Sequence, residues 1–150
     1  MHEQLLQQLT HKYSQFTFEA GNHFSWSAAR KTISYTAIDD TDSIWNLLHE
    51  LGHALLDHSA YTNDMELLKK EVGAWDKALE LAKEFDIIID GDHIEDCLDS
   101  YRDWIFKRST CPECRTQGIQ KAPDRYICIN CKHSWLVTKS RFCRPYRRSE

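Results

Sequence analysis

The segment HELGHALLDH, at residues 49–58, contains the side chains of this chain best suited to metal chemistry. His49 and His53 stand four positions apart, and such positions share one face of a helix, one turn apart. Both imidazoles can therefore bind one ion, and zinc accepts two neutral imidazoles while keeping a coordination position open. Glu50, next to the first histidine, is placed to act as the general base that takes a proton from water during attack on a carbonyl.

This spacing is the H-E-x-x-H pattern typical of zinc metallopeptidases. The alternative is a pair of surface histidines around a surface glutamate. Two features favour the catalytic interpretation: apolar residues recur along the segment at helical spacing, and a β-rich segment that could hold an extended peptide precedes it. Gly52 in mid-helix costs about 1 kcal/mol relative to alanine, which indicates a need for close packing or access at this position.

The third metal ligand has two candidates. His58 follows the motif closely, but ligation requires the chain to turn back, and residues 54–57 include no glycine to make that turn. If the helix continues, this side chain points about 140° away from His53, which favours a helix-end role. Glu71 lies at the centre of the apolar stripe of the next predicted helix, whereas Glu66 lies about 140° away on the polar side.

A lone carboxylate in a buried stripe would cost several kcal/mol of desolvation, and a zinc ion would remove most of that cost. The alternative is that Glu71 pairs with Arg30, Arg102 or a histidine. We predict that His49, His53 and Glu71 bind a catalytic zinc.

Four of the six cysteines form two C-x-x-C pairs, Cys111 with Cys114 and Cys128 with Cys131. Each pair makes a tight turn that directs two thiolates at one point, and two such turns complete a tetrahedral site. We predict a structural zinc, because a segment of about 40 residues buries too little apolar surface to fold without metal. The alternative, a redox dithiol, would not need the second pair.

Composition and charge indicate two soluble modules. With 150 residues, 41% hydrophobic and 28% charged, the chain is typical of a soluble globular protein. It contains neither an apolar run of roughly 18 residues nor a signal-peptide-like stretch, so we expect a cytoplasmic protein without a membrane partner. Residues 1–106 carry 20 acidic and 8 basic side chains, a balance of −12, whereas residues 107–150 carry 3 and 11, a balance of +8. We place the domain boundary between these two segments.

The elements that must position these residues are predicted to form an α+β fold. Helical spacing predicts four helices, near residues 3–13, 44–57, 61–85 and 92–106. Alternating or β-rich stretches predict three strands, at residues 16–19, 24–27 and 31–36. We expect a small antiparallel sheet with a turn at Gly21-Asn22, an active-site helix and a glutamate helix, followed by a small cysteine-rich zinc ribbon with a basic tail.

HELGHALLDH, followed by Glu71-Val72-Gly73-Ala74-Trp75, resembles the ImmA/IrrE family of zinc metallopeptidases over about residues 30–85. The resemblance implies a minimal zincin-like fold of the gluzincin type, with His49, His53 and Glu71 as zinc ligands and Glu50 as base. Family members are often linked to phages, mobile elements or stress responses, and several act on helix-turn-helix repressors. This chain differs in lacking a DNA-binding segment of its own and in ending with a cysteine knuckle.

We therefore expect a metallopeptidase that hydrolyses peptide bonds of a protein substrate, such as a repressor or other regulatory protein recruited by the ribbon. A second interpretation resembles SprT-like proteases, which join an H-E-x-x-H domain to a zinc ribbon and act on DNA-bound proteins, but those take a downstream histidine as third ligand. A third is a non-enzymatic zinc-ribbon adaptor, which the intact Glu50 disfavours. Aromatic and arginine side chains in residues 125–148 suit nucleic acid, an acidic protein face or a solvated tail.

Peptide hydrolysis also requires a group that stabilises the oxyanion. The candidates are Tyr61, His93, Tyr101 and Arg102. The sequence does not discriminate among them, nor does it disclose the oligomeric state.

Overall fold

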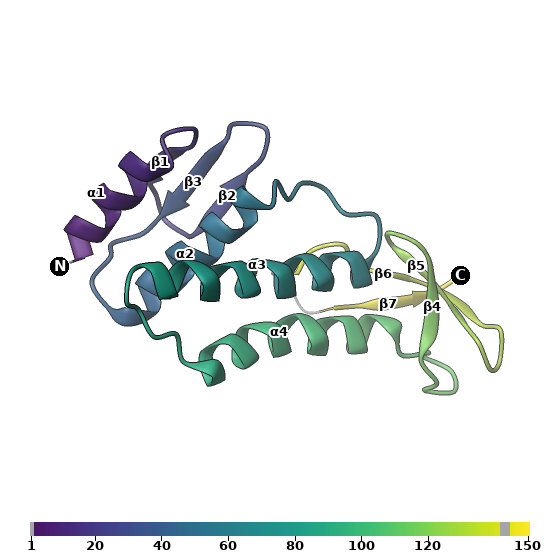
Figure 1. The fold of residues 1–150 in the computed structure, drawn as a ribbon. Helices are drawn as coiled ribbons and strands as arrows, with labels where there is room; N and C mark the ends of the chain where they lie inside the picture. The colour runs from purple at the N-terminus through teal and green to yellow at the C-terminus, as the bar shows by residue number, and fades with distance from the viewer. Residues whose placement is uncertain (1, 142–144) are drawn as a thin grey trace. The chain divides into compact units, whose positions relative to one another are not determined.

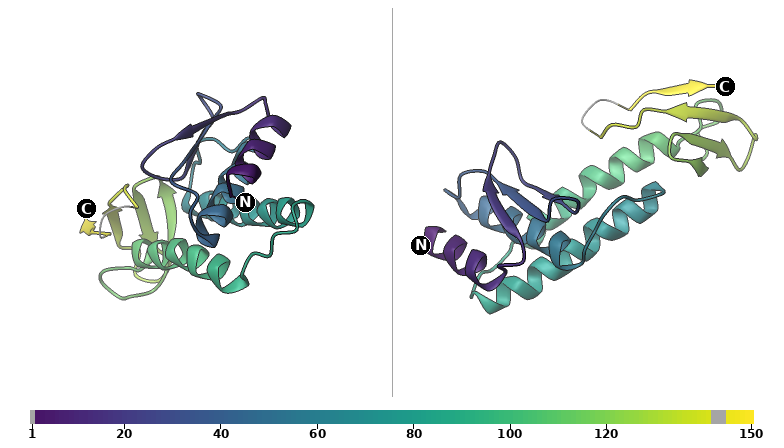
Figure 2. Two further views of the ribbon diagram at one scale, coloured as in Figure 1. Left: turned by 90° about the vertical axis from the view of Figure 1, so that its left-hand side faces the viewer. Right: turned by 90° about the horizontal axis from the view of Figure 1, so that it is seen from above.

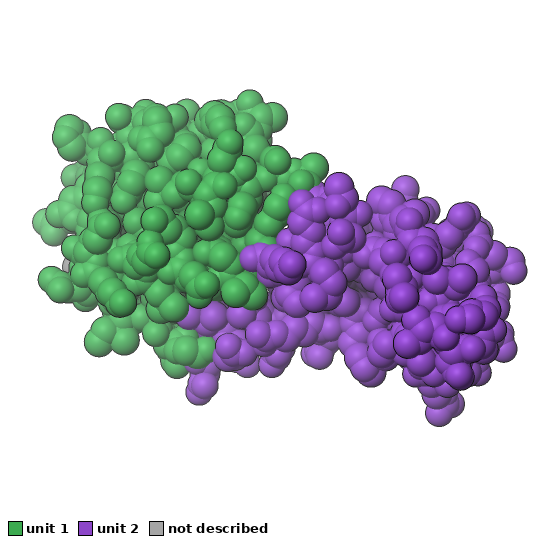
Figure 3. All heavy atoms as spheres, turned by 45° about the vertical axis from the view of Figure 1, so that its right-hand side comes forward, with its two compact units in different colours: residues 1–60, 70–91 green, residues 61–69, 92–150 purple. Residues whose placement is uncertain are grey.

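The computed structural model describes residues 2–141 and 145–150, which form two compact units. Unit 1 comprises residues 1–60 and 70–91, and unit 2 comprises residues 61–69 and 92–150 (Figure 3). Within the described residues, four helices and two small sheets confirm the α+β class (Figure 1). None of the helices in this described part is both long and apolar enough to cross a membrane.

The helices are α1 (His2–Lys12), α2 (Thr41–Leu55), α3 (Asp64–Glu84) and α4 (Gly91–Ser109). The strands of unit 1 are β1 (Thr17–Ala20), β2 (Ser25–Ser27) and β3 (Thr32–Tyr35). Those of unit 2 are β4 (Gly118–Ala122), β5 (Arg125–Cys128), β6 (Ser134–Val137) and β7 (Arg147–Ser149). Figure 2 shows these elements from two further directions.

The three-stranded sheet of unit 1 is mixed, so the predicted antiparallel sheet is wrong in one of its pairs. Its order is β1-β3-β2, with β2 antiparallel to β3 but β1 parallel to it. Ile33 of β3 is fully buried, and the central position gives its strand partners on both sides. The turn at Gly21 therefore carries the chain past β3 to the far edge, and the Gly21 amide donates to the Tyr35 carbonyl at 2.8 Å.

Helix α2 begins at a capping box. The Asp40 side chain accepts a hydrogen bond from the Ser43 amide at 2.8 Å, and the Ser43 hydroxyl accepts one from the Asp40 amide at 3.2 Å. The helix then buries Leu47, Leu48 and Leu51 completely, as expected from its apolar periodicity. This buried face fixes the rotation of α2 against the core, and with it the direction in which its histidines point.

Helix α2 ends at Leu55, and the chain turns back where the prediction had the helix continuing. The amide of Asp57 donates to the Ala54 carbonyl at 3.1 Å, and that of His58 donates to the His53 carbonyl at 3.0 Å. This pair of bonds is a Schellman motif, in which the first residue beyond the cap is left-handed. Asp57, with φ of 51°, takes the place of the usual glycine, because aspartate tolerates this conformation better than most residues.

In unit 1 the backbones of α2 and α3 meet at Gly52 and Ala74. A Cβ atom on Gly52 would lie 2.5 Å from the Ala74 carbonyl oxygen, closer than any real contact. Only glycine permits this approach, which explains why the helix tolerates the residue. Gly52 lies between His49 and His53 in the sequence, and Ala74 lies one turn beyond Glu71, so the contact stands beside the predicted ligands.

Unit 2 contains an antiparallel sheet of order β4-β5-β6-β7. Its small core includes two of the cysteines and is formed by Cys111, Tyr126, Cys128, Trp135 and Val137, with Cys114 packed against it. Trp135 is fully buried, and its indole nitrogen donates to the Arg108 carbonyl at 2.9 Å.

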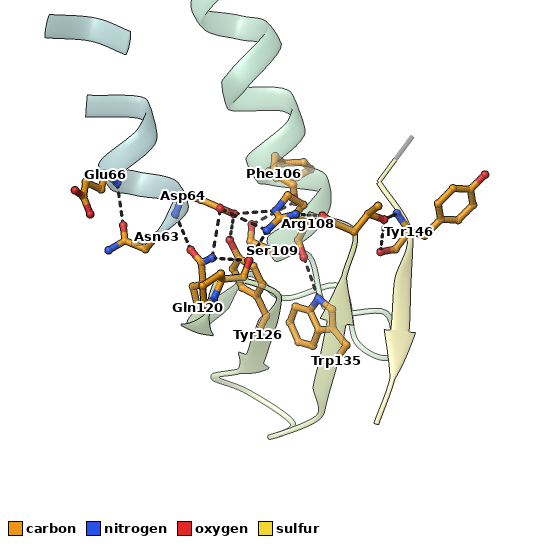
Figure 4. A network of polar contacts seen from close by, with 12 residues as sticks. Asn63, Asp64, Glu66, Phe106, Arg108, Ser109, Gln120, Tyr126, Trp135 and Tyr146 are labelled. Carbon is orange, nitrogen blue, oxygen red and sulfur yellow. Dashed lines mark hydrogen bonds and ion pairs between the residues drawn. The ribbon is translucent and has the colours of Figure 1, made fainter. Parts of the chain in front are cut away.

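A buried ion pair joins Asp64, the first residue of α3, to Arg108 in the last turn of α4 (Figure 4). The Arg108 Nε lies 2.9 Å from Asp64 Oδ2, and only 1% and 3% of the two side chains are exposed. The Tyr126 hydroxyl donates to the same carboxylate, the Asp64 amide donates to Gln120 at 2.8 Å, and Arg108 also donates to the Pro123 carbonyl at 2.8 Å. These bonds satisfy both charges within unit 2.

We expect Gly52→Ala to destabilise unit 1 by about 1–3 kcal/mol, because the added methyl group meets backbone that cannot move aside. Gly73→Ala is the matched control: its Cβ would stand 3.6 Å from Leu56 Cδ1, an ordinary contact, and alanine favours the helix by up to about 1 kcal/mol. Urea denaturation followed by circular dichroism measures both. Equal stability of the two variants would contradict the required approach.

We expect Asp64→Ala to destabilise unit 2 by about 3–5 kcal/mol, because it leaves the Arg108 charge buried without its partner. Glu95→Ala removes only an exposed pair with Arg102 on α4 and should leave the unfolding midpoint nearly unchanged. Thermal unfolding of the two variants tests the contrast. Similar midpoints would show that the buried pair does not stabilise the unit.

Candidate metal centres

The structure brings together the three predicted ligands of unit 1, with two imidazoles from α2 facing one carboxylate from α3. His49 Nε2 lies 3.0 Å from Glu71 Oε2, and His53 Nε2 lies 3.3 Å from Glu71 Oε1. The two Nε2 atoms are 3.1 Å apart. The side chains are 10%, 12% and 8% exposed for His49, His53 and Glu71, so little water competes for them.

These distances match those between ligands around a small metal ion. At zinc–ligand bonds of about 2.0–2.1 Å, the vertices of a tetrahedron stand about 3.3 Å apart. In the structure the two imidazole nitrogens stand 3.1 Å apart, and they lie 3.0 and 3.3 Å from Oε2 and Oε1 of Glu71, so each distance is close to such an edge. Two imidazoles and one carboxylate also form the donor set of open, catalytic zinc sites. The three residues therefore fit a divalent ion.

The two histidines stabilise the negative charge of Glu71. Burial raises the pKa of this carboxyl, but the hydrogen bonds and charges of His49 and His53 outweigh burial and hold the pKa well below its usual value. The alternative arginine partners lie elsewhere: Arg30 bonds Glu19 at 3.2 Å, and Arg102 bonds Glu95 at 2.8 Å. Glu71 instead contacts two histidines, His49 and His53, which are also its predicted co-ligands.

Glu50 follows His49 on α2 and is ionisable near neutrality. Burial raises the pKa of its carboxyl to about 7, against a lowering by His53 and with a further raising by Glu71. A carboxyl in this range can both accept and release a proton at neutral pH. A cation held by the neighbouring residues would lower this pKa and favour the basic form.

Two neighbours of the ligands make contacts that the sequence did not predict: Trp75, and His58, for which the sequence favoured a helix-end role. The Trp75 indole stacks on the His49 imidazole, with ring centroids 4.2 Å apart and planes at 28°. Its place in the stripe around Glu71 signalled burial but not this contact. His58 does not join the converging group, and instead its Nδ1 lies 2.8 Å from Nδ1 of His53.

The four candidates for oxyanion stabilisation all belong to unit 2. Arg102 is engaged with Glu95 and Asp99, the Arg141 guanidinium lies 3.5 Å above the Tyr101 ring, and His93 Nε2 lies 3.7 Å from the Cys97 sulfur. Tyr61 is 43% exposed. The His49–His53–Glu71 group lies in unit 1, so the structure assigns none of the four candidates to it.

The second candidate centre, in unit 2, is formed by all four predicted cysteines. The Cys111 and Cys131 sulfurs are 3.7 Å apart, and those of Cys114 and Cys128 are 3.4 Å apart. Thiolates bound to zinc at about 2.3 Å stand about 3.7 Å apart. Backbone amides of Asn130 and Cys131 approach the Cys128 sulfur at 3.3 and 3.4 Å, the arrangement expected at the tip of a metal knuckle.

The cysteines of this centre differ in how readily they form a thiolate. The side chain and backbone of Thr116, followed by Asn130, lower the pKa of the Cys114 thiol to about 5. Thiolates are the form that binds metal. The Cys131 thiol differs: a backbone hydrogen bond with His133 lowers its pKa, but burial and the neighbouring sulfurs outweigh this and raise the pKa to about 12. This thiol must therefore release a proton when the four-cysteine cluster binds an ion.

Part of the predicted nucleic-acid segment, residues 142–144, lies outside the described residues. Two of the arginines that are described make contacts inside unit 2: Arg125 pairs with Glu150 at 2.7 Å, and Arg147 donates to the Thr110 carbonyl at 2.6 Å. Binding of nucleic acid stays a prediction.

Comparison of the chain with models of protein families, with curated proteins and with solved structures finds no match. The resemblance to the ImmA/IrrE family and the zincin-like character of the fold stay predictions. The geometry of the two centres is therefore the basis for a function.

We expect the wild-type chain to bind two zinc ions and Glu71→Ala to bind one, because the variant removes a buried ligand from the first centre. Glu66→Ala changes another glutamate of the same helix, which accepts a hydrogen bond from Thr62, and should keep two. Native mass spectrometry with elemental analysis gives the count. Two zinc ions in Glu71→Ala would rule this residue out as a required ligand.

Proposed function

We propose that this protein is a zinc-dependent metallopeptidase, related to the ImmA/IrrE type, that hydrolyses peptide bonds of a protein substrate. The observation that carries the proposal is the convergence of His49 and His53 from α2 with Glu71 from α3, at distances close to those between zinc ligands. Glu50, the proposed base, lies on α2 next to His49. A purely structural site would use all four positions for protein ligands, as the cysteine centre does. This donor set leaves one position for substrate or water.

Each residue of the site has a distinct task. His49 and His53 present neutral nitrogens, and Glu71 contributes the negative charge that matches a divalent cation. The ion, when bound, supplies Lewis acidity that polarises a carbonyl and makes water more acidic. Glu50 takes the proton from the attacking water and returns it to the leaving amine, a task suited to its near-neutral pKa.

The sheet of unit 1 offers a way to hold the substrate. β2 is an edge strand of the order β1-β3-β2, and it packs against α2, the helix with both histidines. An extended peptide can add to such an edge by main-chain hydrogen bonds, which makes recognition tolerant of side-chain sequence. This geometry suits an endopeptidase acting on an unfolded or flexible protein segment.

The ribbon in unit 2 is proposed to recruit the protein substrate. Apolar side chains are exposed on it, with Ile119 at 51%, Ile129 at 53% and Tyr146 at 64%. Exposed apolar groups rimmed by charge are typical of protein-binding surfaces. The balance of +8 over residues 107–150 adds a preference for an acidic partner.

A second candidate is proteolysis of DNA-bound proteins, which the same basic charge favours. It shares the chemistry of the first centre and differs in the partner of the ribbon. A glutamate as third ligand departs from the histidine of the SprT-like pattern, which is why we place this function second. A non-enzymatic adaptor would have no need of a half-buried Glu50 beside an open metal site.

We expect Glu50→Gln to keep both zinc ions but to lower the cleavage rate about 10²–10⁴-fold, because the amide cannot accept the proton. New peptide termini in a lysate incubated with wild type or variant, identified by mass spectrometry, give the substrate, and the purified substrate then gives the rate. Glu19→Gln, on the exposed β1, is the matched control and should cleave normally. Normal cleavage by Glu50→Gln would reject the proposed mechanism.

A further inference from the structure

The far side of His53 makes a second contact, outside the three-residue group. Its Nε2 faces His49 and Glu71, while its Nδ1 lies 2.8 Å from Nδ1 of His58. The two rings are inclined at 66° with centroids 5.1 Å apart, an edge-on arrangement suited to a hydrogen bond between ring nitrogens.

A nitrogen–nitrogen hydrogen bond fixes the tautomers of both rings. A neutral imidazole has one donor and one acceptor nitrogen, so one Nδ1 must carry hydrogen and the other must accept it. If His53 donates through Nδ1, its Nε2 keeps a lone pair directed at His49 and Glu71, as metal ligation requires. The opposite choice would place a hydrogen on Nε2 and block the site.

Hydrogen bonds to the main chain of residues 58–60 hold His58 in this place. Its amide closes the Schellman motif on the His53 carbonyl at 3.0 Å, so the two histidines are joined by main chain as well as by side chain. Its carbonyl accepts from the Trp26 indole of β2 at 2.8 Å. The next two carbonyls, of Ser59 and Ala60, accept from Lys70 at 3.2 and 2.8 Å, the residue that precedes Glu71 on α3.

The turn itself is supported by an ion pair. Asp57, in the left-handed conformation, lies 2.8 Å from the ammonium of Lys31 in the turn before β3. His58 is thus connected to the sheet, to α2 and to α3 within unit 1. A histidine that merely ended a helix would not need this set of contacts.

We propose that His58 is a positioning residue for the metal centre: its Nδ1 accepts the hydrogen of His53 Nδ1 and thereby fixes the ring and tautomer in which His53 binds the ion. The inference rests on the metal site of the proposed function and adds a residue to it. Metal-binding histidines depend on such outer partners, and losing one typically weakens metal affinity about 10–100-fold. Here the partner is a second imidazole, delivered by a turn without glycine.

The test compares two substitutions of similar size in the full-length protein. His58→Leu removes the acceptor, and His58→Asn retains one, because the asparagine Oδ1 occupies nearly the position of the imidazole Nδ1. We expect His58→Leu to weaken zinc binding at the His49–His53–Glu71 centre about 10–100-fold and His58→Asn to recover most of the loss. Competition with a chromophoric chelator gives the affinities, and the cysteine centre in unit 2 is the internal reference.

His23→Leu, an exposed histidine of the same unit, is the matched control and should bind zinc like wild type. Wild-type affinity in His58→Leu, or equal losses in the Leu and Asn variants, would overturn the positioning role alone. A wild-type chain that binds zinc only at the cysteines would overturn the metal site of the proposed function, and this inference with it.

Nitrogen-15 NMR of the zinc-loaded wild-type protein tests the same point without a substitution. We expect His53 to carry its hydrogen on Nδ1 and His58 to carry its hydrogen on Nε2. Finding the His58 hydrogen on Nδ1 would overturn the proposal even if the variants fail to fold.

Discussion

The contact between the backbones of Gly52 and Ala74 is the constraint on which the first centre depends. Two helices normally pack with their axes 8–10 Å apart, at a distance set by the side chains between them. Here a missing side chain on α2 lets α3 approach until a methyl group would stand 2.5 Å from a carbonyl oxygen. The ligands lie on both sides of this contact, so the short Glu71 side chain reaches both imidazoles.

Two carboxylates are buried among the described residues, Asp64 and Glu71, and their hydrogen-bond partners differ in kind. Asp64 is bonded by a guanidinium and a phenol, both strong donors that cannot bind a metal as neutral ligands, and its charge is fully compensated. Glu71 is bonded by two imidazoles, which change from donors to acceptors when they lose a proton. The cost of burying Asp64 is therefore offset by partners that cannot be replaced by a metal ion. At Glu71 it is offset by histidines that can bind a metal ion together with the carboxylate.

Unit 2 combines its structural core with its candidate metal site. Two of the cysteines, Cys111 and Cys128, are core residues packed with Tyr126, Trp135 and Val137. A core this small contributes little hydrophobic free energy, so occupation of the cysteine centre and folding of the sheet are expected to be one event. The predicted boundary after residue 106 stays a prediction; the compact unit that contains the ribbon also includes most of α4.

Much of this molecule could be predicted from local sequence patterns. The 3.6-residue period places His49 beside His53, the apolar stripe places Glu71 at its centre, and C-x-x-C spacing pairs the cysteines, because each signal depends only on neighbours along one element. The parallel pairing of β1 with β3 could not be predicted, because it depends on which strand becomes buried. The turn at Asp57 could not be predicted either, because it depends on a partner that holds the left-handed aspartate. Tertiary structure alone decided that α2 and α3 meet at Gly52, because this contact joins two segments whose approach no local period encodes. It also decided that His58 returns to His53, because the left-handed Asp57 of that turn is paired with Lys31 from a distant part of the chain.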